Sequence, residues 1–211
     1  SDGIYVYTGG APWVQVGDMV DVTGTVKEYY VLTEIGSNPT VTRTSTGNVL
    51  PAPVDFDASR PSPNRPQPLN EVERYEGMLV RVQAGTVTGP VDRFGELAAV
   101  ARPGRAFREP GISYPAPAGL PVWDGNPEVF LVKPTALGLP GAQVPAGATF
   151  SATGPLHYTY DQYKIYPTAF SHTGEPTVQP LREPTQSEYL IASQNLYPLL
   201  DDVDDPGITE T

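Results

Sequence analysis

The sequence predicts an all-β protein, and three observations support this. The 211 residues include 25 Pro and 21 Gly spread along the chain, which interrupt helices and punctuate short strands. Tyr, Val and Thr are plentiful, and these side chains suit pleated, half-buried surfaces. Val16, Val20, Val22 and Val26 keep a period of two, which is typical of a strand with one buried face.

The predicted strands follow one another along the chain, with long loops rich in Pro and Gly between them. Gly24 lies inside one strand, and a glycine there indicates a bulge or a tight bend of the kind that closes a barrel. The strands are expected at residues 4–7, 19–26, 29–35, 75–88, 94–100 and 128–132.

One segment is unusually rich in proline. Residues 51–68 contain six Pro in eighteen positions, with Asp, Ser and Asn between them. Because Pro has no backbone N–H to donate to a ladder, we expect a linker or a long surface loop here.

An internal repeat is the most informative feature of the sequence. Residues 17–35 align with residues 147–165 over nineteen positions without a gap. A chance likeness between two hairpins is the alternative, but matching apolar positions favour a true repeat. The matches include Gly17 with Gly147, Val20 with Phe150, Val22 with Ala152, Gly24 with Gly154, Val26 with Leu156, Tyr30 with Tyr160 and Ile35 with Ile165.

Two copies of a strand–Gly–strand hairpin predict two small five-stranded barrels of the OB-fold type. The first copy begins so close to residue 1 that its barrel would lack its opening strands. We therefore expect the first module to be incomplete.

The charge is strongly negative but uneven. A formal net charge of −11 argues on its face against nucleic acid as a partner. Residues 60–108 nevertheless carry eight Arg against five acidic residues. The chain has no Cys, which excludes disulfides and thiolate metal sites, and no apolar run of membrane-spanning length, so we expect no membrane partner.

Several segments resemble secreted bacterial nucleases of the endonuclease/exonuclease/phosphatase superfamily, which often carry OB-fold-like modules ahead of the catalytic domain. The similar segments occur in that family's order and cover nearly the whole chain. They are SDGIYVYTG (1–9), GDMVDVTGTVKEYYVLTEI (17–35), ERYEGMLVRV (73–82), RFGEL (93–97) and ATGPLHY (152–158).

The segment LIASQNLYPLLDDVDDPG (190–207) resembles the first strand of the catalytic αβ-sandwich in these nucleases. The resemblance implies that Asn195 belongs to a site for Mg²⁺ or another divalent cation in the intact protein. The other metal ligands and the catalytic His-Asp pair would follow residue 211, so this chain alone is expected to be inactive. The resemblance also implies a secreted or extracellular bacterial protein, with nucleic acid and its own downstream catalytic domain as partners.

These observations divide the chain into five expected segments. They are an incomplete first OB-like module at 1–50, a Pro-rich linker at 51–69, a second OB-like module at 70–172, a second linker at 173–188, and the start of the nuclease domain at 189–211.

Four arginines lie in or beside the loop that follows residues 93–97. Such loops often contact OB-fold ligands, and arginine binds phosphate well. The alternative is a solvated loop whose charges keep a Pro-rich segment soluble. The four candidate nucleic-acid-binding residues are Arg93, Arg102, Arg105 and Arg108.

Tyrosines cluster in both copies of the repeat. OB-folds stack single-stranded bases on aromatic rings, which is worth about 1–3 kcal/mol per base. The alternative is that the rings pack in the core with their hydroxyls at the rim. The candidates are Tyr158, Tyr160 and Tyr163, whereas alternation places Tyr29 and Tyr30 on opposite faces of their strand.

An acidic cluster follows Asn195 in the expected start of the nuclease domain and consists of Asp201, Asp202, Asp204 and Asp205. It lacks the Gly and the distal Glu of an EF-hand loop, which favours a solvated loop over a cation site.

Three functions remain open at this point. The first is an accessory region that presents nucleic acid to a nuclease domain, which the fold, the arginines and the resemblance favour. The second is a structural spacer or protein-interaction module, which the net charge favours. The third is a carbohydrate-binding module, for which only Trp13 and Trp123 offer stacking platforms.

Overall fold

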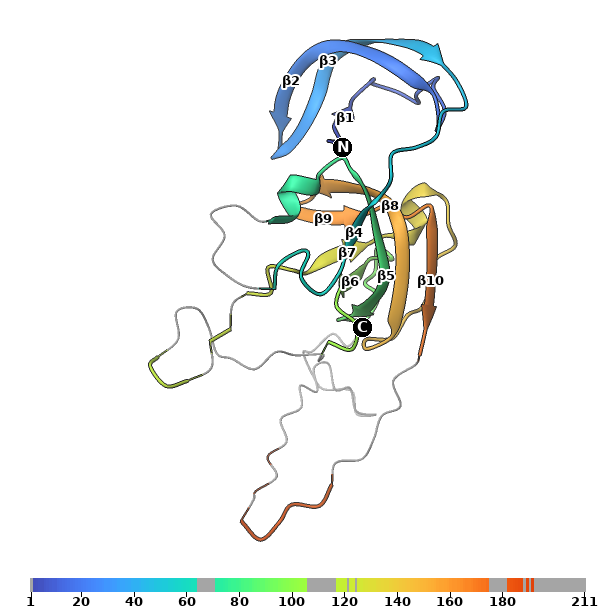
Figure 1. Ribbon diagram of the computed structural model, residues 1–211. Helices are drawn as coiled ribbons and strands as arrows, with labels where there is room; N and C mark the ends of the chain where they lie inside the picture. The colour runs from blue at the N-terminus through green and yellow to red at the C-terminus, as the bar shows by residue number, and fades with distance from the viewer. Residues whose placement is uncertain are drawn as a thin grey trace, which may run out of the picture. The chain divides into compact units, whose positions relative to one another are not determined.

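The computed structural model describes residues 2–63, 71–105, 117–120, 122–123, 125–174, 182–187, 189 and 191. This part of the chain holds strands and two short 3₁₀ helices, which confirms the predicted all-β class (Figure 1). The strands are β1 (Tyr5–Val6), β2 (Met19–Tyr29), β3 (Leu32–Ser45), β4 (Val54–Phe56), β5 (Leu79–Val87), β6 (Leu97–Val100), β7 (Phe130–Val132), β8 (Thr149–Thr159), β9 (Gln162–Ile165) and β10 (Ala169–Thr173). The 3₁₀ helices are η1 (Glu71–Tyr75) and η2 (Pro134–Leu137).

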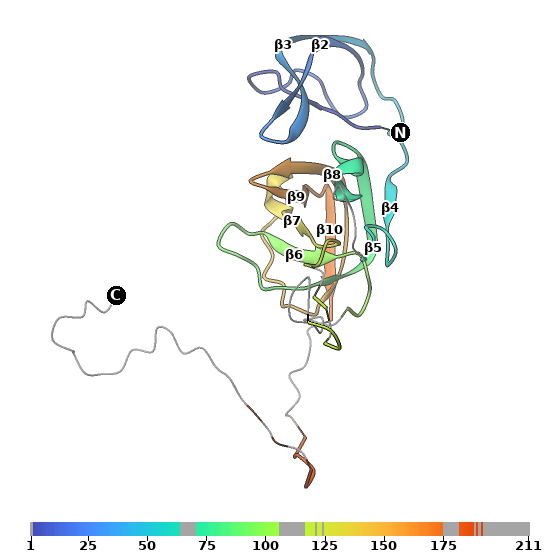
Figure 2. The ribbon, with the colours of Figure 1, turned by 90° about the vertical axis from the view of Figure 1, so that its left-hand side faces the viewer.

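Five strands close into a barrel. Around it the order is β5-β6-β7-β9-β8, and β8 pairs again with β5 (Figure 2). The neighbours are antiparallel except β7 and β9, which run parallel. This order, with η2 between the third and fourth barrel strands, is the arrangement of an OB-fold.

The barrel interior is filled by alternate side chains of its strands, as the period of two requires. On β8, Phe150, Ala152 and Leu156 are buried. Gly85 leaves room for the ring of Phe150, because a Cβ there would lie 2.4 Å from Cε1 of that ring. The buried core also contains Val80, Val82, Leu97, Phe130, Val132, Tyr163 and Ile165.

The prediction of a Pro-rich linker at 51–69 is wrong in part. Within it, β4 pairs in parallel with β5 from Val54↔Val80 to Phe56↔Val82, and Phe56 joins the barrel core. The physical reason is that β4 itself contains no Pro and lies at the edge of the sheet, where flanking prolines are tolerated.

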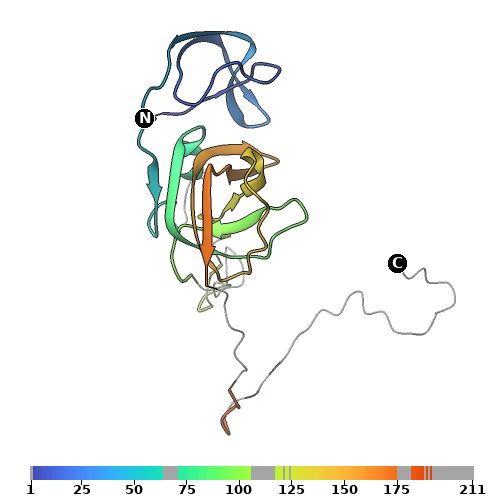
Figure 3. The ribbon, with the colours of Figure 1, turned by 90° about the vertical axis from the view of Figure 1, so that its right-hand side faces the viewer.

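A second edge strand, β10, runs antiparallel to the first half of β8, as the orange strand in Figure 3 shows. It ends at Thr173, one residue beyond the expected end of the second module. The compact unit that contains all ten strands spans Ser1–Pro176. The expected start of the nuclease domain at 189–211 lies outside the described residues, except for Tyr189 and Ile191.

The first module is a three-stranded sheet in the order β1-β3-β2. Strands β2 and β8 begin and end 130 residues apart, and so do the starts of β3 and β9. β1 pairs in parallel with β3 at Glu34 and Ile35, as β7 pairs with β9 at Lys164 and Ile165. The repeat is therefore structural, and the first module corresponds to the last three strands of the barrel.

Gly24 forms an irregularity in β2, as predicted, because the pairing register with β3 shifts between Thr23 and Thr25. A Cβ at Gly24 would lie 2.5 Å from Cγ2 of Ile35. The expected strand at 29–35 is instead divided by a turn, since β2 ends at Tyr29 and β3 begins at Leu32.

Candidate binding site

The two copies of the repeat end in the same kind of hairpin turn. Tyr30 and Val31 have φ angles of 48° and 69°, and Tyr160 and Asp161 have φ angles of 52° and 59°. Two positive φ angles in a two-residue loop match the right-handed twist of a hairpin. Each turn presents one tyrosine at its tip, with 81% of Tyr30 and 88% of Tyr160 exposed.

Both turns line one pocket of about 520 Å³, which we call the tyrosine pocket. Six tyrosines line it, namely Tyr5, Tyr7, Tyr29, Tyr30, Tyr158 and Tyr160. The remaining lining residues are Leu32, Glu34, His157, Thr159 and Asp161. The pocket thus combines β1 and the two equivalent hairpin tips.

Contacts between rings hold part of this lining in place. The rings of Tyr29 and Tyr30 meet edge to face, with 4.8 Å between their centroids. Tyr5 packs against His157 at 5.2 Å. The ammonium group of Lys27 lies 5.4 Å from the Tyr29 ring centroid, within the range of a cation–π interaction.

The pocket lining carries carboxylates rather than cations. Glu34 is only 3% exposed and pairs with Lys27, whose Nζ lies 3.1 Å from Oε1. Burial, and secondarily the charge of Lys164, lowers the pKa of His157, which favours its neutral form. No Arg or Lys belongs to the lining within the described ranges. The pocket therefore offers flat aromatic faces but little attraction for a phosphate.

Further carboxylates stand beside the pocket. Burial, and then the charge of Glu28, raises the pKa of Glu73, and burial also raises the pKa of Glu76. The pKa of Tyr158 is raised by burial and by the neighbouring Asp161. This acidic surrounding further disfavours a phosphate or another anionic group.

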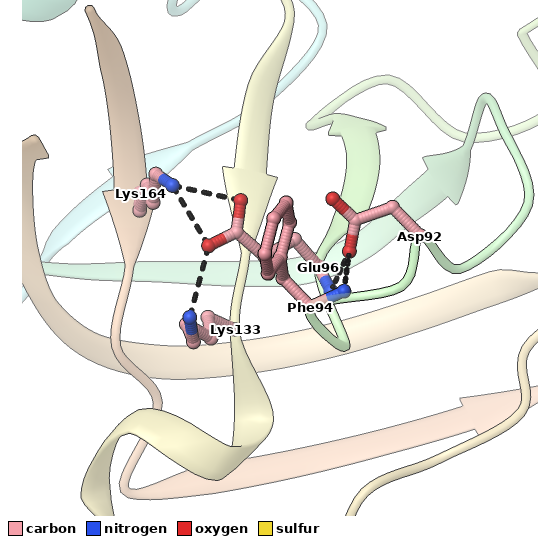
Figure 4. A network of polar contacts seen from close by, with 5 residues as sticks. All are labelled: Asp92, Phe94, Glu96, Lys133 and Lys164. Atoms are coloured by element: carbon pink, nitrogen blue, oxygen red, sulfur yellow. Dashed lines mark hydrogen bonds and ion pairs between the residues drawn. The ribbon is translucent and has the colours of Figure 1, made fainter. Parts of the chain in front are cut away.

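A buried ionic network lies next to the hairpin turn between β8 and β9, which carries Tyr160. The Glu96 carboxylate accepts hydrogen bonds from Nζ of Lys164 at 2.7 Å and from Nζ of Lys133 at 3.1 Å (Figure 4). Asp92 accepts the backbone N–H groups of Phe94 and Glu96, each at 2.8 Å. Lys164 also approaches the Tyr160 ring, with Nζ 5.7 Å from its centroid. The network ties the loop between β5 and β6 to the strand that follows the Tyr160 turn.

The predicted tyrosines divide between the pocket and the core. Tyr158 and Tyr160 line the pocket. Tyr163 is 8% exposed, packs in the barrel core and donates its hydroxyl to Glu73, so its position fits the core alternative. Tyr29 and Tyr30 share the pocket instead of facing opposite sides, because Tyr30 lies in the turn.

The predicted arginines are not brought together at the pocket. Arg105 is 6% exposed, and its Nη2 lies 2.8 Å from Oε1 of Glu128, so this guanidinium supports the fold. Arg93 is exposed beside the Phe94 ring, at 4.7 Å, and Arg102 is exposed. Arg108 lies outside the described residues.

Sequence reasoning missed Tyr5, Tyr7 and His157 as pocket residues. The alignment of the two repeat copies does hold a signal for His157, because His157 corresponds to Lys27, which contacts the pocket residues Glu34 and Tyr29. The parallel pairing of β1 with β3, which brings Tyr5 beside Glu34, leaves no comparable trace in the sequence.

The expected metal position cannot be placed, since Asn195 and the four aspartates at 201–205 lie outside the described residues. Within the described ranges, no group of three or more His, Asp or Glu side chains is arranged to hold a metal ion. No helix in those ranges is long and apolar enough to cross a membrane.

The closed five-stranded barrel and its strand order define an all-β protein of the OB-fold type. A family model described as a domain of unknown function (DUF8508) matches residues 64–176, more than half of the chain, and the chain belongs to this family. The matched range includes β5 to β10 but not the first module. Neither the curated proteins nor the solved structures contain a match to the chain.

Proposed function

We propose that this chain is the non-catalytic accessory region of a secreted, metal-dependent nuclease, and that it holds single-stranded nucleic acid for the downstream catalytic domain. The observation that carries the proposal is the tyrosine pocket, where two equivalent hairpin tips offer exposed rings on one site. The assignment to a nuclease rests on the resemblance of the ordered sequence segments to the endonuclease/exonuclease/phosphatase superfamily.

The chemistry of the pocket favours bases over phosphates. OB-folds bind oligonucleotides through their barrel loops, including the loop between the fourth and fifth strands, which here carries Tyr160. Every base has an aromatic face that can stack on tyrosine, whereas the carboxylates of Glu34 and Asp161 disfavour a phosphate inside the pocket. We expect a base to enter the tyrosine pocket while the sugar-phosphate backbone of the nucleic acid stays in solvent.

The test is a fluorescence-anisotropy titration of the 211-residue chain with labelled single-stranded and double-stranded oligonucleotides, both DNA and RNA. Stacking of about 1–3 kcal/mol per base predicts that Tyr30→Ala and Tyr160→Ala each weaken single-strand binding by roughly 5- to 150-fold. Tyr30→Phe and Tyr160→Phe keep the ring and are expected to retain most of the affinity.

A matched control is Tyr189→Ala, since Tyr189 is 94% exposed and lies outside the pocket. Because stacking rather than ion pairing supplies the affinity, a shallow dependence on salt is expected. Single-strand binding that survives Tyr30→Ala and Tyr160→Ala together, but falls when Arg93 and Arg102 become Ala, would contradict the pocket as the site.

A structural spacer is the second candidate, and the net charge of −11 with the carboxylates around the pocket favours it. The same titration separates the two functions. A spacer shows no oligonucleotide binding at low salt, even at protein concentrations of hundreds of micromolar.

A further inference from the structure

Comparison of the two modules shows two strand edges that are paired in the barrel and that, within the described part of the chain, have no partner strand in the first module. In the barrel, β8 pairs with β5 and β7 pairs with β6. Their equivalents in the first module are β2 and β1. Each of these pairs only with β3 among the residues that the structure describes.

The exposed fractions of equivalent residues show which strand contacts of the barrel are missing from the first module. Val26 is 60% exposed, whereas its counterpart Leu156 is 1% exposed. The backbone of Leu156 donates to the carbonyl of Met78 and accepts from Gly77, both at 2.9 Å, so the chain entering β5 satisfies this position. Val26 pairs with Ile35 as Leu156 pairs with Ile165. Because the register is the same, the backbone N–H and C=O of Val26 point toward the free edge of β2.

The interior side of the sheet is also incompletely covered. Val20 and Val22 are half-buried, whereas their counterparts Phe150 and Ala152 are 1% and 2% exposed. Trp13, from the loop before β2, lines an apolar groove with both valines but remains 58% exposed. The three strands therefore leave apolar surface that a closed barrel would bury.

We propose that the first module is a docking site for one antiparallel β-hairpin, whose two strands pair with the free edges of β2 and β1 and close its barrel. Free strand edges are templates for such addition. The hairpin strand along β2 requires apolar side chains at alternate positions, to cover Val20, Val22 and Val26. The hairpin enters in the same polypeptide from the N-terminal side of β1, because β5 and β6 precede β7 in the barrel.

This inference concerns the edges of the first module and is independent of nucleic-acid binding. The first experiment uses the 211-residue chain and a synthetic peptide with the sequence of residues 77–101, which contains the β5–β6 hairpin. A Val26→Cys variant carries an environment-sensitive fluorophore that reports burial of this position. Saturable, blue-shifted fluorescence is expected with this peptide and not with a peptide that has Pro in place of Val80 and Val82.

A second experiment does not depend on the affinity of a free peptide. The same 77–101 sequence is joined ahead of Ser1 through a flexible linker, and hydrogen exchange is followed by NMR. We expect exchange of the Val26 amide to slow by at least about 10-fold relative to a Pro-substituted extension, because a paired amide must open before it exchanges. Equal exchange rates in both extended chains would overturn the proposal.

The 211-residue chain without an extension tests the competing occupant, which is a second copy of the chain. A dimer by light scattering, with a Val26 amide that is protected in the dimer and exposed on dilution, would assign the edge to a second copy. That result would overturn the same-chain hairpin whether or not the chain binds oligonucleotides.

Discussion

The carboxylate of Glu76 accepts a hydrogen bond from the backbone N–H of Thr33, with 2.9 Å between Oε1 and the nitrogen. Thr33 belongs to the first module, and Glu76 lies just before the first strand of the barrel. Burial raises the pKa of Glu76, and the charges of Glu73 and Glu28 raise it further, although the bond from Thr33 opposes them. A carboxylate with a raised pKa thus links the first module to the segment that enters the barrel.

This relationship predicts a pH-dependent effect of Glu76→Gln. Because the folded pKa of Glu76 lies above the unfolded value of 4.5, the folded chain binds the proton more tightly. Protonation of the Glu76 carboxyl therefore contributes most to the free energy of unfolding below pH 4.5, and this contribution is lost as the pH rises through the folded pKa. We expect Glu76→Gln, which keeps the acceptor for Thr33, to raise the melting temperature at pH 7 and to lose that advantage near pH 4.5. A difference that stays constant across this range in thermal scans would contradict the assignment.

The turn at Tyr30-Val31 predicts a stabilising substitution. A φ of 69° is unfavourable for a β-branched side chain, and such strain costs on the order of 1–3 kcal/mol. Val31 is 56% exposed, so little packing is lost when its side chain is removed. We expect Val31→Gly to raise the free energy of unfolding by about 1 kcal/mol in urea denaturation. Asp161→Gly is the matched control and should gain less, since Asp adopts positive φ more readily than Val.

The buried pair of Lys164 and Glu96 predicts a large loss of stability. Lys164 Nζ lies 2.7 Å from both carboxylate oxygens, and its side chain is 4% exposed. Lys164→Met leaves a buried carboxylate with Lys133 as its remaining partner, and removal of one partner of a buried pair costs about 3–5 kcal/mol. The control is Arg81→Met, whose exposed pair with Asp55 should leave the unfolding midpoint almost unchanged. Equal losses in the two variants would show that burial does not set the strength of these pairs.

The backbone around Gly154 leaves no room for a methyl group. A Cβ there would lie 2.1 Å from the carbonyl oxygen of Tyr166, a backbone atom that cannot move aside alone. We expect Gly154→Ala to cost at least about 1–3 kcal/mol, measured by chemical denaturation, because overpacking displaces the backbone. Gly89→Ala is the matched control, since its Cβ would meet only Cβ of Ala98, at 3.6 Å. A variant at Gly154 as stable as the one at Gly89 would disprove this close approach.

Local pattern was sufficient for part of the fold. The alternation of Val20, Val22 and Val26 located β2, and Gly24 marked its irregularity. The repeat of residues 17–35 at 147–165 indicated two related modules, and the strands match at a constant offset of 130 residues. These signals are visible because strand periodicity and turn chemistry act between residues close in the sequence.

The candidate site was only partly predictable. Tyr158 and Tyr160 were identified from their place in the repeat, and both line the pocket. Tyr163 has the same residue type and lies nearby in sequence, yet it packs in the core. The difference arises because Tyr160 lies in a turn, where strand alternation no longer determines the direction of the side chain.

The sequence by itself determined the all-β class and the hairpin repeat, because each depends on local spacing. Only the tertiary structure decided that β4 pairs with β5 inside a Pro-rich segment, and that Arg105 is buried against Glu128. It also decided that Tyr30 and Tyr160, 130 residues apart, share one pocket. These are long-range contacts, and their free energy depends on which surfaces meet when the chain folds, which no local pattern records.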